Sequence, residues 1–155
     1  PGIAAMAAAL KEACANMDEN TKKVTALRDR LIDGIAKIPH CALNGARSPR
    51  LPGNVNFCFE GIEGESLLLL LDAKGISASS GSACTSGSLD PSHVLLAIGR
   101  PHEVAHGSLR LTICEDNTEE DIDYILAELP PIVSYLRDMS PVWKDLMSGK
   151  RQFTL

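Results

Sequence analysis

One cysteine of this chain lies in a segment made almost entirely of small polar residues. Residues 79–88 read Ser-Ser-Gly-Ser-Ala-Cys-Thr-Ser-Gly-Ser, and two glycines and five serines cannot fill a core. The composition therefore predicts a loop that faces solvent or a ligand. An accessible thiol among hydroxyls and backbone N–H groups is favoured as the thiolate, its nucleophilic form. Cys84 is thus a candidate nucleophile, and the alternative is a Ser/Gly linker that happens to carry a cysteine.

A second candidate is Arg110, which interrupts an apolar segment over residues 108–114. Leu109, Leu111 and Ile113 alternate and face one way, so the guanidinium should face the other way, opposite the core. An arginine inside such a strand is costly unless its charge is solvated or paired. Arg110 is therefore either a solvated outer-face residue or an anchor for a carboxylate, which suits the fork geometry of a guanidinium.

Residues 102–106 read His-Glu-Val-Ala-His, which matches the H-E-x-x-H pattern of zinc peptidases. That chemistry needs His102 and His106 one turn apart on a helix, with Glu103 as the general base. The run lies between Pro101 and Gly107, and no third ligand follows at a suitable spacing. We therefore expect a loop here, disfavour a zinc hydrolase, and assign no metal ligand.

The Ser/Gly segment suggests one more class of function. A loop rich in N–H groups that leads into a helix start favours anions such as phosphate. The segment carries neither the P-loop pattern nor the G-x-G-x-x-G pattern. An anion-binding or protein-interaction module thus remains as an alternative to nucleophilic chemistry.

The elements that must position these residues follow from the apolar periodicity. Residues 3–38 are predicted as one long helix, and unless it breaks near Asn20, its Ala-rich first half should pack on something outside this domain. The other expected elements are strands over 54–59, 76–78 and 108–114, and helices over 65–74, 90–99 and 118–136, the last kinked at Pro130-Pro131, with a polar tail that frays after Met147. This order predicts an α+β fold, a small sheet of about three strands covered on one face by helices.

Size and charge narrow the function classes. The chain has 155 residues, enough for one domain, and a net charge of −5 with no lysine/arginine run argues against nucleic acid and anionic membranes. The longest aliphatic run, Leu67–Leu71, is too short to cross a bilayer. The chain begins without an initiator Met or a basic leader, so we expect a piece of a longer protein without a signal peptide. Its five widely spaced cysteines favour reduced thiols in the cytoplasm, with Cys14 and Cys58 in the core.

Five short sequence motifs occur in a specific order along the chain. They are residues 51–57 (Leu-Pro-Gly-Asn-Val-Asn-Phe), 75–87, which include the cysteine loop, 92–94 (Ser-His-Val), 107–111 (Gly-Ser-Leu-Arg-Leu) and 118–123 (Thr-Glu-Glu-Asp-Ile-Asp). Together they closely resemble the C-terminal part of NifS/IscS-type cysteine desulfurases, which are pyridoxal-phosphate enzymes of the class-V aminotransferase type. The long cysteine loop is similar to that of the NifS/IscS branch.

The resemblance extends from Pro1 to about Asp138 and implies a fold, a reaction and partners. It implies that residues 1–155 are the single small C-terminal domain of a fold-type I pyridoxal-phosphate enzyme, a cytoplasmic homodimer when complete. It implies that sulfur from L-cysteine passes to Cys84 as a persulfide, that L-alanine leaves, and that an iron–sulfur scaffold or another acceptor protein takes the sulfur. Arg110 matches the arginine that holds the substrate carboxylate.

Two departures from the family pattern matter. The larger domain that carries the cofactor-linked lysine has no counterpart here, and Lys74, just before the Gly75 turn, has the wrong context for that lysine. We therefore expect no cofactor-binding residue in this chain, no pyridoxal phosphate bound to it alone, and no activity alone. The second departure is Cys114-Glu115-Asp116, where the family would have a turn that contains glycine.

Overall fold

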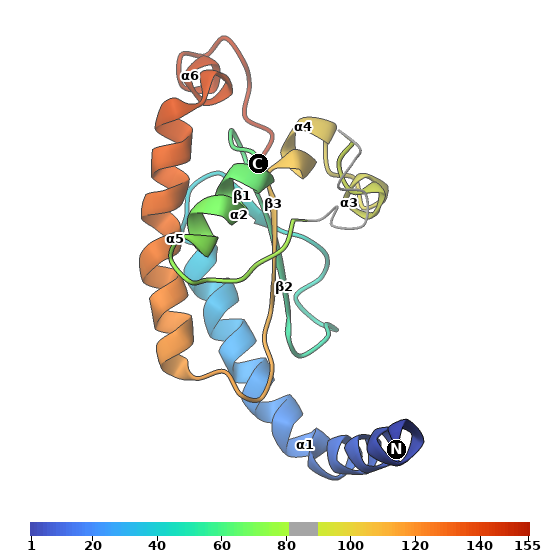
Figure 1. Cartoon of the computed structure of the whole chain (residues 1–155). Helices are drawn as coiled ribbons and strands as arrows, with labels where there is room; N and C mark the ends of the chain where they lie inside the picture. The colour runs from blue at the N-terminus through green and yellow to red at the C-terminus, as the bar shows by residue number, and fades with distance from the viewer. Residues whose placement is uncertain (81–89) are drawn as a thin grey trace.

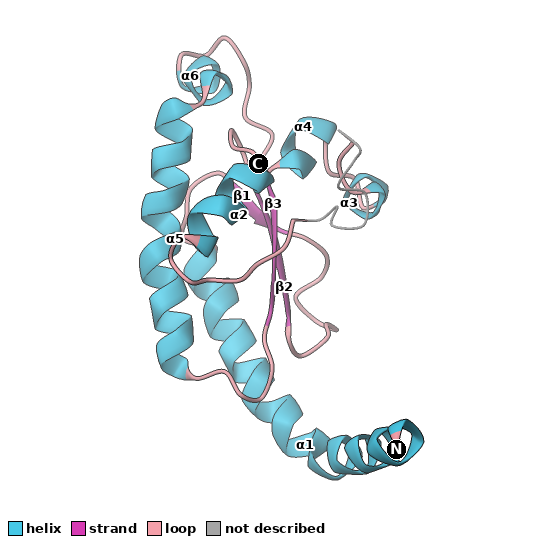
Figure 2. Ribbon diagram, viewed as in Figure 1, coloured by secondary structure: helices cyan, strands magenta, loops and turns pink. Residues whose placement is uncertain are grey.

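Helices and a small antiparallel sheet form the chain in the computed structural model, which describes residues 1–80 and 90–155. The elements are shown in Figures 1 and 2. In chain order they are α1 (Gly2–Ile35), β1 (Cys41–Leu43), β2 (Asn54–Phe59), α2 (Gly64–Asp72), α3 (His93–Ala97), α4 (His102–His106), β3 (Ser108–Thr112), α5 (Glu119–Met139) and α6 (Pro141–Met147). The three strands lie in the order β1-β2-β3, and both pairs are antiparallel.

The main core lies between one face of this sheet and three helices. The second half of α1, together with α2 and α5, covers that face, as Figure 1 shows. Leu109 and Leu111 of β3 and Ile113 just after it are buried, which confirms the predicted alternation. The α+β fold with a three-stranded sheet and a long first helix is confirmed. A smaller apolar cluster on the opposite face joins β2 to α3 and α4 through Cys58, Leu95, Val104 and Ala105.

The first strand of the sheet is the main difference from the prediction. Pro39 lies just beyond the end of α1, His40 adopts a φ of 51°, and residues 41–43 then return to pair with β2. Residues 76–78, predicted as a strand, belong to no strand, although Ser79 forms a single bridge with Arg110. A strand of three residues has too little periodicity to be recognised locally, so only its pairing with β2 defines it.

The C-terminal part also differs from the prediction. The Thr118 capping box forms as expected, and α5 includes Pro130 and Pro131 as predicted but ends at Met139, three residues later than predicted. The residues after Met147 do not fray. The buried Glu60 carboxylate accepts hydrogen bonds from the Thr154 N–H, at 2.7 Å, and the Thr154 hydroxyl, at 2.9 Å. Charge-assisted hydrogen bonds of this kind hold the C-terminal end of the chain in place, although its polar sequence predicts no partner in the core.

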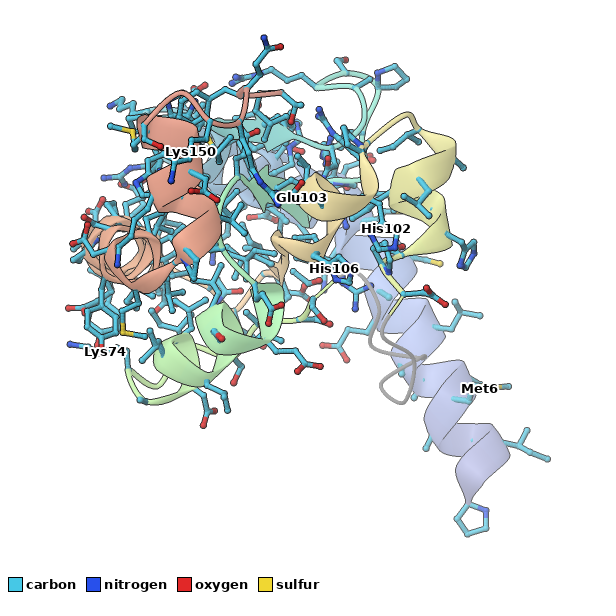
Figure 3. All side chains as sticks on the ribbon, turned by 90° about the horizontal axis from the view of Figure 1, so that it is seen from above. Met6, Lys74, His102, Glu103, His106 and Lys150 are labelled. Atoms are coloured by element: carbon cyan, nitrogen blue, oxygen red, sulfur yellow. The ribbon has the colours of Figure 1, made fainter. Side chains whose placement is uncertain are left out.

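The first half of α1 extends away from the rest of the fold without a break in its 34 helical residues (Figure 1). Residues 1–19 are exposed, and Met6 lies far from the sheet in Figure 3. An apolar stripe runs along this half, with Ile3 84% and Leu10 64% exposed. Cys14 is exposed here too, so its predicted place in the core is wrong. In the part of the chain that the structure describes, no helix combines the length and hydropathy needed to cross a membrane.

We expect this stripe to make the isolated chain self-associate, or to leave residues 3–18 frayed, because exposed apolar stripes drive association. The double substitution Met6→Glu/Leu10→Glu should shift sedimentation towards the monomer, whereas Lys11→Glu, on the same turns, should not. A monomer whose N-terminal helix is well protected from hydrogen exchange would contradict this expectation.

Candidate functional site

Arg110 lies in the middle of β3 on the face away from the main core, and its side chain is exposed. Its cross-strand neighbour is Asn56 of β2. On its other side the backbone pairs with Ser79, since the Ser79 N–H donates to the Arg110 carbonyl at 3.0 Å and the Arg110 N–H donates to the Ser79 carbonyl at 2.6 Å. The guanidinium Nη2 also lies 3.3 Å from Ser79 Oγ. The predicted outward orientation of Arg110 is therefore correct.

The segment with the candidate nucleophile starts at this bridge. Cys84 itself lies outside the described residues. Ser79, which pairs with Arg110, precedes the segment, and Pro91 and Ser92, both buried, follow it. Leu95 of α3 then packs in one cluster with Cys58 of β2. Both described flanks of the Ser/Gly segment are thus attached to the face of the sheet that carries Arg110.

A hydrogen-bonded amide pair lies beside Arg110 on this outer face. The buried Asn44 donates from Nδ2 to Asn56 Oδ1 at 2.7 Å and to Cys58 Sγ at 3.1 Å. Arg100 donates in turn to Asn44 Oδ1 at 2.7 Å and to the Leu43 carbonyl at 2.6 Å. These contacts fix the Asn56 side chain and connect Arg100 to it through Asn44. Asn44 and Arg100 carry no sequence signal that would have singled them out, because their partners lie on other elements.

Two of the other thiols are protected by the fold. Cys58 is buried and Cys41 is partly buried, and burial raises the pKa of both thiols, because it disfavours the thiolate. The prediction of a core position for Cys58 is confirmed. Cys14 and Cys114 are exposed. Among the described thiols, these two are therefore the ones that can compete with Cys84 for a reagent.

The H-E-x-x-H run is helical, so the loop expected there is wrong. The Ala105 N–H donates to the Pro101 carbonyl at 2.9 Å, which closes one helical turn. The rings of His102 and His106 lie 4.8 Å apart between centroids (Figure 3), while Glu103 forms an ion pair with Arg151. In residues 1–80 and 90–155 no group of three or more His, Cys, Asp or Glu side chains is placed to hold a metal ion. A catalytic zinc site needs a third protein ligand, which the described residues do not offer.

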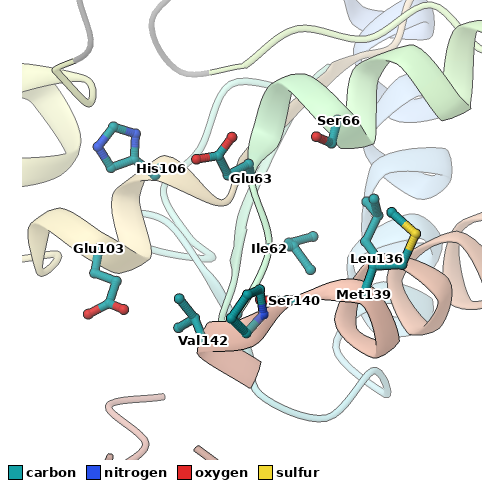
Figure 4. A pocket seen from close by; sticks show the side chains of 11 residues that line it. Ile62, Glu63, Ser66, Glu103, His106, Leu136, Met139, Ser140 and Val142 are labelled. Atoms are coloured by element: carbon teal, nitrogen blue, oxygen red, sulfur yellow. The ribbon is translucent and has the colours of Figure 1, made fainter. Parts of the chain in front are cut away.

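A groove of about 360 Å³ lies between α2, α4, the end of α5 and the start of α6. Ile62, Leu136 and Met139 form its apolar part, and Glu63 and Glu103 lie at its edge, as Figure 4 shows. Its lining includes neither Arg110 nor Ser79, so this groove is separate from the candidate site on the outer face of the sheet.

The comparisons with known proteins show the family of this chain. The model of the family "Aminotransferase class-V" matches residues 1–125, and the chain belongs to that family. It is 58% identical over 154 residues to a cysteine desulfurase IscS of Clostridium botulinum (strain Hall), which covers 97% of this chain and 39% of that protein. It is 49% identical over 142 residues to the cysteine desulfurase NifS of Azotobacter vinelandii, with 91% of this chain and 35% of that protein covered.

Solved structures give the same result. A structure titled "NIFS-LIKE PROTEIN" superposes with a TM-score of 0.73 at 30% identity, over 84% of this chain and 32% of that chain. A NifS-like protein from Rickettsia africae superposes with a TM-score of 0.68 at 26% identity, over 77% and 31% of the two chains. The chain thus spans about two fifths of the length of its curated relatives, for example 39% of the Clostridium protein.

The lysines of this chain do not fit a buried cofactor site. Every lysine is exposed. Lys74 lies 3.0 Å from the Glu128 carboxylate, and its hydrogen bond with that carboxylate raises the pKa of the ammonium. A lysine that forms a Schiff base needs a desolvated pocket and a lowered pKa. The residues present therefore do not supply the lysine of a pyridoxal-phosphate enzyme.

We expect Cys84 to react faster than the other four thiols, because its Gly/Ser surroundings offer hydrogen-bond donors and no apolar cover. Timed labelling with iodoacetamide followed by peptide mapping measures each rate. Cys41 and Cys58 should label last, since burial raises the pKa of both. The exposed Cys14 and Cys114 are internal controls, and faster labelling at either would contradict the prediction.

Proposed function

We propose that this chain is the C-terminal domain of a cysteine desulfurase, in which Cys84 accepts sulfur from L-cysteine and Arg110 holds the substrate carboxylate. The observation that carries the proposal is the pairing of Ser79 with Arg110, which ties the start of the Cys84 segment to the strand of the candidate carboxylate anchor. The names of the curated relatives support the reaction class.

The role of Arg110 follows from its place on the sheet. None of the ion pairs among the described residues involves Arg110, and the one hydrogen bond of its side chain there is to a neutral hydroxyl. A guanidinium carries five donors, so most remain available for a bidentate contact with a carboxylate. Arg100, which donates to Asn44 beside Asn56, adds positive charge to this face. The outer face of β3 is therefore suited to a small anionic substrate.

The proposed role of Cys84 is supported by its short distance along the chain from Ser79, which pairs with Arg110. Cys84 lies five positions after Ser79, so the two Cα atoms can lie at most about 18 Å apart. The thiolate attacks the sulfur of L-cysteine; a sulfur–sulfur bond forms and the carbon–sulfur bond of the substrate breaks. The electron pair of that bond stays with the carbon, which takes up a proton. L-alanine leaves, Cys84 carries a persulfide, and no external oxidant or reductant is consumed.

The rest of the full-length protein supplies the cofactor in this proposal. Pyridoxal phosphate provides the electron sink for cleavage of the carbon–sulfur bond. Its lysine belongs to the domain that this chain does not contain. The sulfur then passes to an acceptor protein such as an iron–sulfur scaffold, and the complete enzyme is a cytoplasmic homodimer. The anion-binding alternative is weaker, because the helix after the Ser/Gly segment has five residues and offers little helix dipole.

The chain alone should bind no pyridoxal phosphate and release no sulfide from L-cysteine, because its lysines are exposed and none matches the cofactor-linked lysine. Absorbance spectra before and after gel filtration with added cofactor measure this. The full-length Clostridium relative serves as the positive control. A cofactor band that stays with the chain through gel filtration, and that borohydride reduction fixes to it, would contradict the expectation.

The two proposed roles should separate in a chimera in which this chain replaces the matching segment of the Clostridium protein. Cys84→Ser should leave the absorbance of the bound cofactor unchanged and stop alanine production, because only the sulfur acceptor is lost. Cys114→Ser, at an exposed cysteine of the described residues, is the matched control and should keep full activity.

Arg110→Ala in the same chimera should lower kcat/KM for L-cysteine roughly 30- to 1000-fold, since loss of a charge-assisted bidentate contact at a partly desolvated site costs about 2–4 kcal/mol. Arg47→Ala removes an exposed arginine that pairs only with Asp33 on the surface, and it should change kcat/KM little. If Arg110→Ala stays within about threefold of the parent, the carboxylate role is wrong.

A further inference from the structure

The backbone of Arg110 has only one place to form its hydrogen bonds. The Phe59 N–H donates to the Gly107 carbonyl, and the Ile113 N–H donates to the Gly53 carbonyl. Because antiparallel strands alternate between hydrogen-bonded and non-hydrogen-bonded pairs, Asn56 and Arg110 form a non-hydrogen-bonded pair between these two. The N–H and carbonyl of Arg110 therefore point away from β2, towards the sheet edge, where both form hydrogen bonds with the backbone of Ser79.

The hydroxyl of Ser79 has a fixed hydrogen-bond direction. Ser79 Oγ lies 3.1 Å from the Ser80 carbonyl, which can only accept, so the hydroxyl proton points there. The Oγ lone pairs then accept from Arg110 Nη2, at 3.3 Å. Residues that face each other in a bridge place their side chains on the same face of a sheet, so this contact holds the guanidinium over the outer face.

On the other side of Arg110, Asn56 is held by its own partner. Its side chain is close to Arg110, because side chains approach most closely in a non-hydrogen-bonded pair. Asn56 Oδ1 already accepts from Asn44 Nδ2, at 2.7 Å. Among the described residues, Ser79 Oγ is thus the side-chain acceptor that contacts the guanidinium.

We propose that Ser79 is a positioning residue, whose hydroxyl and backbone together orient the Arg110 guanidinium towards the substrate carboxylate. This inference rests on the proposed function of Arg110. Ser79 touches no reacting atom; it restricts the rotamers of a long side chain before the substrate binds, which lowers the entropy cost of the bidentate contact. The same residue lies five positions before Cys84 in the sequence.

The test uses the chimera with the Clostridium protein and the substitution Ser79→Ala, which removes the hydroxyl and leaves the backbone bridge. We expect KM for L-cysteine to rise about 3- to 10-fold, with kcat within about twofold, because the lost contact serves binding of the carboxylate. Ser79→Thr keeps the hydroxyl and should restore KM to within about twofold. Ser77→Ala, at an exposed serine of the same segment, is the matched control and should change neither parameter.

Inhibition by L-alanine separates carboxylate positioning from an effect on the Cys84 segment. L-alanine keeps the carboxylate and lacks the sulfur, so its inhibition constant should rise by the same factor as KM for L-cysteine. A rise in KM without a rise in the inhibition constant would overturn the inference. So would an extra loss of more than about twofold when Ser79→Ala is added to Arg110→Ala, since Ser79 would then act on something other than Arg110.

The outcome for Arg110 distinguishes the two proposals. If Arg110→Ala leaves KM and the inhibition constant unchanged, the carboxylate role itself fails and the role of Ser79 fails with it. If Arg110→Ala has the expected effect and Ser79→Ala stays within about twofold of the parent, the proposed function stands and only the positioning role of Ser79 is wrong.

Discussion

The register between β2 and β3 is the constraint on which the rest of this structure depends. Side chains along a strand alternate between the two faces, so a slip of one residue would exchange every inward and outward side chain. In the observed register Leu109 and Leu111 enter the core and Arg110 faces outward. A slipped register would bury the guanidinium among leucines and isoleucines and expose those leucines to water. The apolar core therefore fixes the direction of the one charged side chain on which the proposed site relies.

Glycines at both ends of the β2–β3 pair allow this register. A Cβ atom on Gly107 would lie 2.1 Å from the Phe59 carbonyl oxygen, and one on Gly53 would lie 2.1 Å from the Ile113 carbonyl oxygen. Those two carbonyls belong to the residues whose N–H groups donate to the glycine carbonyls, so neither position can accept a larger residue without moving the strands. Both glycines lie in motifs that carry the resemblance to the family, and close backbone approach gives a physical reason for a glycine at each position.

The outer face of the sheet is built from segments far apart in the sequence. Leu155 packs against the apolar cluster around Cys58, and Glu60 holds the backbone of Thr154 and Leu155. Arg100 reaches Asn44, and Ser79 reaches Arg110. These contacts cover one part of the outer face and leave the part around Arg110 exposed. A substrate or a neighbouring domain can therefore approach the guanidinium from this side.

The sequence alone determined the elements whose signals are local. The alternation around Arg110 predicted its strand and its outward direction, and the motif at residues 118–123 predicted the capping box. The composition around Cys84 singled out that thiol, which the structure does not describe. Tertiary structure decided the rest. β1 exists only through its pairing with β2, the last residues are held by Glu60, by the stacking of Phe153 on His40 and by the packing of Leu155, and Ser79 meets Arg110 only across the sheet edge. Such contacts join residues that are distant in the chain. Local periodicity cannot predict a partner that comes close only when the chain folds.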